Sequence, residues 1–428
     1  MDDNFFKGVR DASLILSRSS GEERNVALSS IALALEKNRK RIEEANKRDL
    51  EEAERNGGRA SLISRLRYTE GKMAQSLKGL GEVISLPDPV FRTREKREID
   101  SSFVLEKVAV PLGVIGMVFE ARPDALIQIA SLALKSGNGL ILKGGREAHN
   151  TNRVLTSVIK EATEEFSFGS GWIEALETRE DVGELLKAEE WVDLIIPRGS
   201  NSFVKFVMEN THIPVLGHSD GLCITYVEKS ASPEESVKIL VDAKTDYPAA
   251  CNATETILLD EEIAPSLLPL LDRAFTEKGV KVHADSVSLP YFTSAVEATE
   301  DDWNTEYLAL ECAVKSVKSI EEAVDHIASH SSKHTDAILT GDAAAADYFV
   351  HRVDSADVFV NCSTRFADGY RFGLGSEVGI STSRLHARGP VGLDGLMTTK
   401  WILRGHGETV GEYSGPDAVK TFHFRELT

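Results

Sequence analysis

The sequence predicts an α/β protein built on parallel sheets. Between residues 114 and 197, short apolar runs alternate with stretches of helical length and pattern. Because parallel strands need a crossover helix, this alternation is typical of βα units. With 428 residues, 42% of them hydrophobic and 27% charged, the chain is long enough for two or three globular domains. We expect strands at 114–119, 139–142, 172–176 and 193–197, and helices at 124–135 and 147–164.

The first 85 residues precede this region and are helical in pattern. Apolar residues recur there at spacings of three, four and seven, between charged stretches that we interpret as solvated helix faces. The positions that carry the pattern are Leu28, Ile31, Leu35 and Ile42. The Leu-Pro-Asp-Pro run at 86–89 ends the helical region, and the alternation at 101–108 predicts a short strand or hairpin.

Composition excludes several classes of partner. The net charge of −19, from 49 basic and 68 acidic residues, would repel nucleic acids and anionic membranes. No apolar run approaches the roughly 18 residues of a membrane span, and the acidic start lacks the features of a secretion signal. Four widely spaced cysteines suggest neither a disulfide framework nor a zinc knuckle. We therefore expect a protein of the reducing cytoplasm.

Cys251 is the candidate nucleophile. It follows Pro248 and two alanines and precedes Asn252, so regular structure ends just before a thiol that has small neighbours. A thiolate in such a loop can form acyl intermediates, whereas the alternative is a small buried core cysteine. The other cysteines lie in strand-like runs, where we expect buried structural residues. They are Cys223, Cys312 and Cys362.

Charged residues and glycines follow three of the predicted strands, where ligands of parallel sheets bind. These segments are Glu120 to Pro123, Lys143 to Arg146, and Arg198 to Ser200. Gly199 and Ser200 open a predicted helix, whose free N–H groups and dipole suit a pyrophosphate. Neither a G-x-G-x-x-G fingerprint nor a P-loop occurs there. The glycine-rich stretch 373–379 lacks a lysine for a phosphate, and we expect a loop.

Motifs along the whole chain resemble the γ-glutamyl phosphate reductase family. The matching segments are 111–116 (PLGVIG), 120–123 (EARP), 134–138 (LKSGN), 142–145 (LKGG), 246–253 (DYPAACNA), 323–338, 386–390 (HARGP) and 399–401 (TKW). The resemblance implies an aldehyde dehydrogenase-like α/β fold, with two parallel-sheet Rossmann-like domains and a small β arm for oligomerisation. The implied NADP-binding domain comprises residues 1–98, with the N-terminal helices, and 111–228. The implied catalytic domain comprises residues 229–395, and the oligomerisation arm comprises 99–110 and 396–428.

The resemblance also assigns cofactor positions. Lys143 matches a lysine that reaches the adenosine ribose, and Gly199 and Ser200 match the turn under the pyrophosphate. Glu306 falls where relatives hold the nicotinamide ribose. Arg146 stands where NAD-preferring relatives often carry glutamate, and a cation there would attract the 2′-phosphate of NADPH. The alternative for Arg146 is a solvated arginine in the first helical turn.

Two departures from the hydrolytic aldehyde dehydrogenases point to a reductive reaction. Ala121 stands in place of an asparagine that holds the oxyanion, and Leu216 in place of the glutamate that activates water. The resemblance therefore implies that Cys251 attacks glutamyl 5-phosphate, phosphate leaves, and NADPH reduces the thioester to the semialdehyde, the second step of proline synthesis. We expect the oxyanion on the Cys251 N–H and the Asn252 amide.

Substrate recognition needs local cations in so acidic a chain. Arg365 matches the loop that lines the substrate tunnel of relatives, and its planar fork suits the α-carboxylate. Arg122 is the candidate for the acyl phosphate, with His218 as a helper; surface ion pairs are the alternative for both arginines. The run His326, His330, His334 has helical spacing, but without an H-E-x-x-H motif we assign no metal.

Alternative functions come from different classes. A hydrolytic aldehyde dehydrogenase is disfavoured by Leu216 and Ala121, and a non-catalytic scaffold by the intact Cys251 and cofactor positions. We expect a homo-oligomer without nucleic-acid or membrane partners. The labile acyl phosphate would come from a glutamate 5-kinase, which could associate with the protein.

Overall fold

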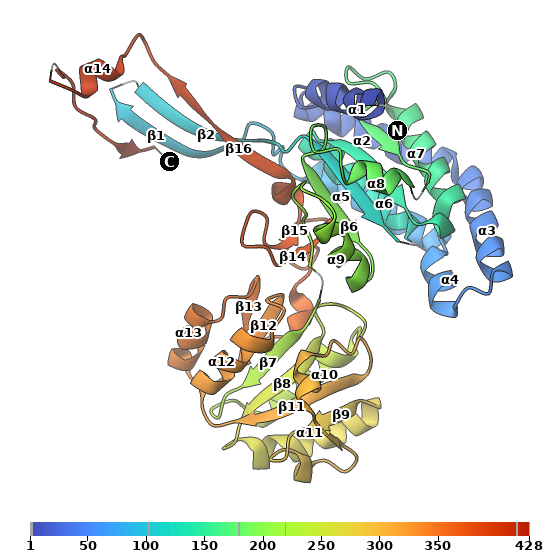
Figure 1. Ribbon diagram of the computed structural model, residues 1–428, viewed down its shortest axis with the longest axis vertical. Helices are drawn as coiled ribbons and strands as arrows, with labels where there is room; N and C mark the ends of the chain where they lie inside the picture. The colour runs from blue at the N-terminus through green and yellow to red at the C-terminus, as the bar shows by residue number, and fades with distance from the viewer. Residues whose placement is uncertain are drawn as a thin grey trace.

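The computed structural model describes residues 3–101, 103–120, 122–178, 180–218, 220–416 and 418–427. The chain folds into a first α/β domain with N-terminal helices, a second α/β domain, and an arm that projects from the body (Figure 1). Among the described residues, no helix is long and apolar enough to span a bilayer.

The N-terminal region is helical, which confirms the pattern expected for it. The helices are α1 Asp3–Leu16, α2 Gly21–Lys37, α3 Arg39–Arg55, α4 Ala60–Leu66 and α5 Glu70–Ser85. Ser20 and Thr69 cap α2 and α5 by accepting hydrogen bonds from the amides of Glu23 and Lys72, which satisfies otherwise unpaired donors. Leu28, Ile31, Leu35 and Ile42 are buried against the first domain, so the apolar face anchors these helices.

The first domain is a parallel sheet in the order β5-β4-β3-β6. Its strands are β3 Val114–Phe119, β4 Gly139–Gly144, β5 Ile173–Ala175 and β6 Leu194–Arg198, and its helices are α6 Pro123–Ser136, α7 His149–Thr163 after the 3₁₀ turn η1 Arg146–Ala148, α8 Glu180–Leu185 and α9 Asn201–Glu209. The predicted strands and helices are confirmed, and the short α8 is additional. The strand order reverses between β3 and β6, and ligands of such sheets commonly bind in the crevice at this point.

The second domain is a parallel sheet in the order β10-β9-β11-β8-β7-β12-β13. Its strands are β7 Cys223–Val227, β8 Thr254–Asp260, β9 Lys281–Ala284, β10 Val296–Glu297, β11 Glu311–Val317, β12 Thr335–Leu339 and β13 Asp357–Val360. The helices are α10 Pro233–Thr245, α11 Ala264–Lys278, α12 Ile320–His330 and α13 Ala343–Arg352, with 3₁₀ turns η2 Leu289–Tyr291, η3 Glu300–Asn304 and η4 Thr364–Phe366. Leu240 and Phe275 of α10 and α11 belong to one core, and Ile327 and Phe349 of α12 and α13 to the other.

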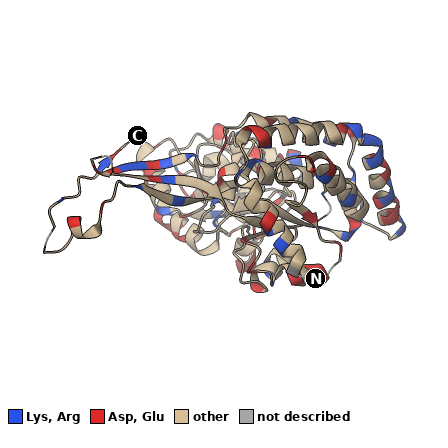
Figure 2. Ribbon diagram, turned by 90° about the horizontal axis from the view of Figure 1, so that it is seen from above, with Lys and Arg blue, Asp and Glu red and all other residues tan. Residues whose placement is uncertain are grey.

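The arm is an antiparallel sheet in the order β16-β2-β1-β17. It consists of β1 Thr93–Asp100, β2 Phe103–Pro111, β16 Met397–Arg404 and β17 Arg425–Glu426, with α14 Val410–Tyr413 near its tip; β14 Gly379–Ser381, β15 Gly389–Val391 and η5 Leu393–Leu396 connect it to the body. Figure 2 shows charges of both signs along these strands. Residues 93–98 pair within this sheet, so their assignment to the first domain was wrong.

Candidate active site

Cys251 lies in a turn just before β8. The amide of Ala250 donates to the Tyr247 carbonyl (3.1 Å) and that of Ala253 to the Ala250 carbonyl (2.9 Å), which folds the loop around a half-buried thiol. Gly221 packs directly behind it, since a Cβ at this position would lie 2.5 Å from both Cα and Cβ of Cys251. The thiol is therefore held in a tight loop, as the small residues of the sequence predicted.

The parallel sheet brings two histidines to this thiol. Strands β8, β7 and β12 are neighbours, and Cys251, His218 and His334 all lie in segments that lead into their amino ends. Cys251 Sγ and one ring nitrogen of each histidine lie within 4.8 Å of one another. The two imidazole rings meet edge to face, with centroids 4.7 Å apart. The result is a Cys-His-His cluster that links the segment between the domains to the second sheet.

Each imidazole is oriented by an oxygen at Nδ1. His218 Nδ1 is 2.8 Å from the Ile380 carbonyl, which can only accept, so Nδ1 carries the hydrogen and Nε2 is a free acceptor. His334 Nδ1 is 2.8 Å from Thr335 Oγ1. His334 is fully buried, and its Nε2 has no hydrogen-bond partner among the described residues. Burial lowers the pKa of His218, which favours the neutral ring.

His334 is a functional candidate that the sequence analysis missed. It was grouped with His326 and His330, which lie on α12, with their ring centroids 4.3 Å apart. The helix ends at His330, and His334 directly precedes the buried strand β12. The signal that separates His334 from the helix is the pair Ser331 and Ser332, which follows the end of α12 and precedes the strand segment 335–339.

Two of the other three cysteines are buried on strands, as expected for structural residues. Cys223 and Cys312 are fully buried on β7 and β11, as expected. Cys223 Sγ donates to the Cys251 carbonyl at 3.2 Å, and burial raises the pKa of Cys223 well above its usual range. Cys362 is half-buried and follows β13, so the expectation of a strand position was wrong there.

Asn252 supports the loop from behind. It is buried, and its Nδ2 donates to the Ala367 carbonyl at 2.7 Å, which ties the Cys251 loop to the segment after η4. Leu216 is buried in the apolar core of the first domain, so this position supplies no carboxylate. Ala121, the other expected departure, lies outside the described residues.

Gly199 and Ser200 precede α9, and Glu306 of the second domain contacts the first residue of that helix. A Cβ at Gly199 would lie 2.9 Å from Glu120 Cδ and from a Phe203 ring carbon, so only glycine fits without rearrangement. Ser200 is the N-cap residue of α9. Asn201, the first residue of that helix, donates to Glu306 Oε2 at 2.7 Å. A hydrogen bond thus joins the start of α9 to a carboxylate of the second domain.

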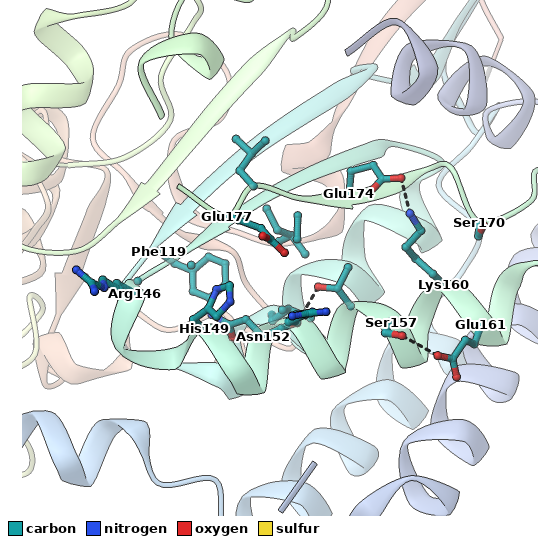
Figure 3. Close-up of a pocket in the computed structure, with 18 of the residues that line it drawn as sticks. Phe119, Arg146, His149, Asn152, Ser157, Lys160, Glu161, Ser170, Glu174 and Glu177 are labelled. Atoms are coloured by element: carbon teal, nitrogen blue, oxygen red, sulfur yellow. Dashed lines mark hydrogen bonds and ion pairs between the residues drawn. The ribbon is translucent and has the colours of Figure 1, made fainter. Parts of the chain in front are cut away.

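A cavity of about 410 Å³ lies beyond the end of β4 (Figure 3). Lys143 ends in a hydrogen bond from Nζ to the Gly144 carbonyl (2.5 Å), and burial lowers its pKa. Arg146 is exposed at the rim, and in Figure 3 its side chain extends away from the other labelled residues. The labelled lining residues include His149, Asn152, Glu174 and Glu177.

A second cavity of about 350 Å³ lies between α5, α6 and the 368–377 loop. Its charged lining residues are Lys72, Arg122, Asp124, Arg198, Asp368 and Glu377. Burial lowers the pKa of Arg198, and electrostatic interactions with Glu377, Arg122 and Cys251 also influence this pKa. Arg198, the last residue of β6, lines this cavity and interacts electrostatically with Cys251. The sequence analysis named Arg198 only as part of the pyrophosphate turn.

Arg365 pairs with the segment that leads to Cys251. Its Nε donates to Asp246 Oδ2 at 3.2 Å, and its side chain is only 12% exposed. Asp246 opens the loop that carries Cys251, and Arg371 contacts the same carboxylate at 3.5 Å. Arg365 is not among the residues that line the second cavity, whereas Arg122 is.

The two parallel-sheet domains and the antiparallel arm define an α/β protein of the aldehyde dehydrogenase fold. An acetylating aldehyde dehydrogenase from Geobacillus thermoglucosidasius has this fold, with a TM-score of 0.65 and 18% identity over 95% of this chain and 96% of that one.

No family model matched the chain. A γ-glutamyl phosphate reductase from Pelotomaculum thermopropionicum is 49% identical over 98% of this chain and 96% of the relative. The crystal structure of the Thermotoga maritima γ-glutamyl phosphate reductase aligns with a TM-score of 0.93 and 39% identity, over 95% of this chain and 99% of that one. The chain belongs to the γ-glutamyl phosphate reductase family and is an oxidoreductase of proline biosynthesis.

Proposed function

We propose that the protein reduces L-glutamyl 5-phosphate to L-glutamate 5-semialdehyde and phosphate, with NADPH as reductant and Cys251 as nucleophile. The observation that carries the mechanism is the half-buried Cys251 beside His218, combined with apolar Leu216 where hydrolytic relatives place their water-activating glutamate. Without that base, a thioester on Cys251 is protected from water and persists until it is reduced.

The chain's own residues carry the acylation step. His218 Nε2 is an acceptor because Nδ1–H is held by Ile380, so this nitrogen takes the thiol proton as Sγ attacks the acyl carbon. The carbonyl oxygen becomes an oxyanion near the Cys251 N–H, and the C–O bond to phosphate then breaks. Asn252 fixes the loop and can offer a second donor, each such donor contributing about 3 kcal/mol in the transition state.

The cofactor fits the β3/β6 crevice. Gly199 leaves room for a pyrophosphate, and the N-terminus of α9 after Ser200 supplies free amides. Glu306 would accept hydrogen bonds from the hydroxyls of a ribose. When bound, NADPH supplies the hydride that converts the thioester into the aldehyde and frees the Cys251 thiolate. An engineered glycolyl-CoA reductase of the same fold, 14% identical with a TM-score of 0.65, holds NADP⁺. In this arrangement Lys143 would donate a hydrogen bond to the adenosine ribose.

Preference for the phosphorylated cofactor rests on Arg146. It stands at the rim of the cavity that follows β4, where a 2′-phosphate would sit beyond the ribose. Arg146 is exposed and its side chain is free to turn toward a phosphate, so we assign it that role.

The substrate enters through the second cavity. Its lining combines cations with carboxylates, which suits a ligand that carries both an ammonium and carboxylate or phosphate groups. We assign Arg122 to an anionic group of the substrate and Arg198 to the region next to the thiol. Arg365 acts through Asp246 on the geometry of the Cys251 loop, and a direct contact with the α-carboxylate remains its alternative role.

The arm is proposed to mediate homo-oligomer formation. Its strands expose the large apolar side chains Trp401 and Leu403 of β16, and Phe424 is exposed next to β17, which suits contact with a second copy of the chain. Sedimentation of the full chain would test this, since a monomer at micromolar concentration contradicts it.

The proposed reaction is tested in reverse. Purified protein with glutamate 5-semialdehyde should reduce NADP⁺ only when phosphate is added, and Cys251→Ser should abolish turnover while the fold and NADPH binding persist. Cys312→Ala, at a fully buried cysteine on β11, is the matched control and should retain activity. Phosphate-independent turnover would identify a hydrolytic aldehyde dehydrogenase instead.

A further inference from the structure

The Cys-His-His cluster has the composition of a metal site. Its three side chains come from separate segments that lead to neighbouring strands, and their donor atoms lie within 4.8 Å of one another. Thiolate sulfur and imidazole nitrogen are the donors that Zn²⁺ prefers. In a tetrahedral zinc site such atoms lie about 3.3–3.8 Å apart, so a contraction of roughly 1 Å would close the cluster.

The hydrogen bonds behind the histidines match those of metal ligands. A ligating imidazole is usually fixed by a hydrogen bond between its other nitrogen and a carbonyl, carboxylate or other oxygen group. His218 Nδ1 has the Ile380 carbonyl, and His334 Nδ1 has Thr335 Oγ1, each at 2.8 Å. His334 Nδ1 also lies 3.7 Å from Cys223 Sγ, and with Nδ1 so engaged in both rings, Nε2 is the nitrogen open to a ligand.

His334 provides independent evidence for a ligand. Its side chain is completely buried, yet Nε2 has no hydrogen-bond partner among the described residues. A buried polar atom without a partner lowers the stability of the fold by about 1–3 kcal/mol. A cation bound beside the thiol would give this imidazole nitrogen a partner.

We infer that His218, Cys251 and His334 form a reversible inhibitory site for a borderline-soft divalent cation such as Zn²⁺. The cation replaces the thiol proton, which leaves to solvent, and a water completes the tetrahedron. No redox change is involved. The site itself rests on geometry, while inhibition rests on the proposed role of Cys251, because a metal-bound thiolate cannot attack the acyl phosphate.

The second histidine cluster is a natural contrast. His326 and His330 are close together on α12, but Lys315 Nζ lies 3.3 Å from His326 Nδ1. An ammonium at that distance would repel a metal ion. His330 is therefore a suitable control position, a histidine outside both the cofactor and the substrate cavities.

Binding is tested with Co²⁺ as a spectroscopic probe for the zinc site. Titration of the metal-free full-length protein should give one equivalent of binding with an intense thiolate-to-cobalt charge-transfer band. Cys251→Ser should remove the band, and His218→Ala and His334→Ala should each weaken binding by roughly tenfold or more. His330→Ala should match the parent. Circular dichroism verifies the fold, and if His334→Ala fails to fold, the other two variants carry the test.

Activity provides the second measurement. Zn²⁺ should inhibit the forward reaction, an excess of chelator should restore it, and Mg²⁺ at the same concentration should have no effect because it prefers oxygen ligands. A missing charge-transfer band, or equal Co²⁺ affinity in the parent and Cys251→Ser, would overturn the metal site. If Cys251→Ser loses the band but keeps its turnover, the metal site stands and the proposed nucleophile fails.

Discussion

Gly221→Ala should impair catalysis by displacing the nucleophile from behind. The new Cβ would overlap the Cys251 carbonyl oxygen and lie 2.5 Å from the Cα and Cβ of Cys251, whereas ordinary contacts are 3.4–4 Å. Backbone cannot yield as a flexible side-chain tip does, so the Cys251 loop must shift by about 1 Å. A displacement of that size at a reacting group costs about 100-fold in rate, and the overpacking costs about 1–3 kcal/mol of stability.

The measurement combines steady-state kinetics with the rate at which an alkylating reagent modifies Cys251. In Gly221→Ala we expect kcat to fall by about 100-fold while NADPH affinity stays within about threefold, because the cofactor crevice is formed by other segments. Gly217→Ala is the matched control in the same linking segment, since its Cβ would meet Pro197 no closer than 3.6 Å. Equal kcat in the two variants would refute the close packing of Gly221 on Cys251.

Three further changes probe the cofactor, the substrate and the stability. Arg146→Glu should reduce the ratio of NADPH to NADH turnover by about tenfold through repulsion of the 2′-phosphate, and an unchanged ratio would remove Arg146 from the site. Arg122→Lys should lower kcat/KM for the glutamyl substrate by more than about tenfold, or 1.4 kcal/mol, with cofactor affinity unchanged; a larger loss in Arg365→Lys would make Arg365 the carboxylate anchor. Between pH 7 and pH 5, the free energy of unfolding of the parent should fall by about 2 kcal/mol more than that of His326→Gln, measured by urea unfolding. Burial beside Lys315 lowers the pKa of His326 to about 3, below its unfolded value near 6.5, so its contribution is complete above that value and lost as pH falls. Parallel pH profiles of parent and variant would contradict this.

The first sheet could be predicted from sequence because its strands are buried on both faces. β3 and β4 read as continuous apolar runs for that reason, and α6 between them is apolar along most of its length. The start of β1 was missed because Thr93–Asp100 is strongly charged and lies in the exposed arm. Its pairing with β2 decides its structure, and a pairing between distant segments leaves no local periodicity.

The candidate site was predictable only where chemistry is local. Cys251 was found because its loop is made of small residues, and Gly199 because it opens a helix after a strand. His334 was missed since its role depends on β12 lying beside β7, a neighbour relation set by the order of the sheet. The position of Arg365 depends on Asp246, an ion pair that joins residues far apart in the chain.

The overall charge of −19 and the anionic ligands are compatible because the decisive cations are few and local. At physiological salt the Debye length is about 8 Å, so distant surface carboxylates contribute little inside a cavity. Arg122, Lys143 and Arg198 follow or end three neighbouring strands of the first sheet, β3, β4 and β6. Since the carboxyl ends of parallel strands share one edge, this topology concentrates positive charge where the phosphate groups must bind, while the rest of the surface remains acidic.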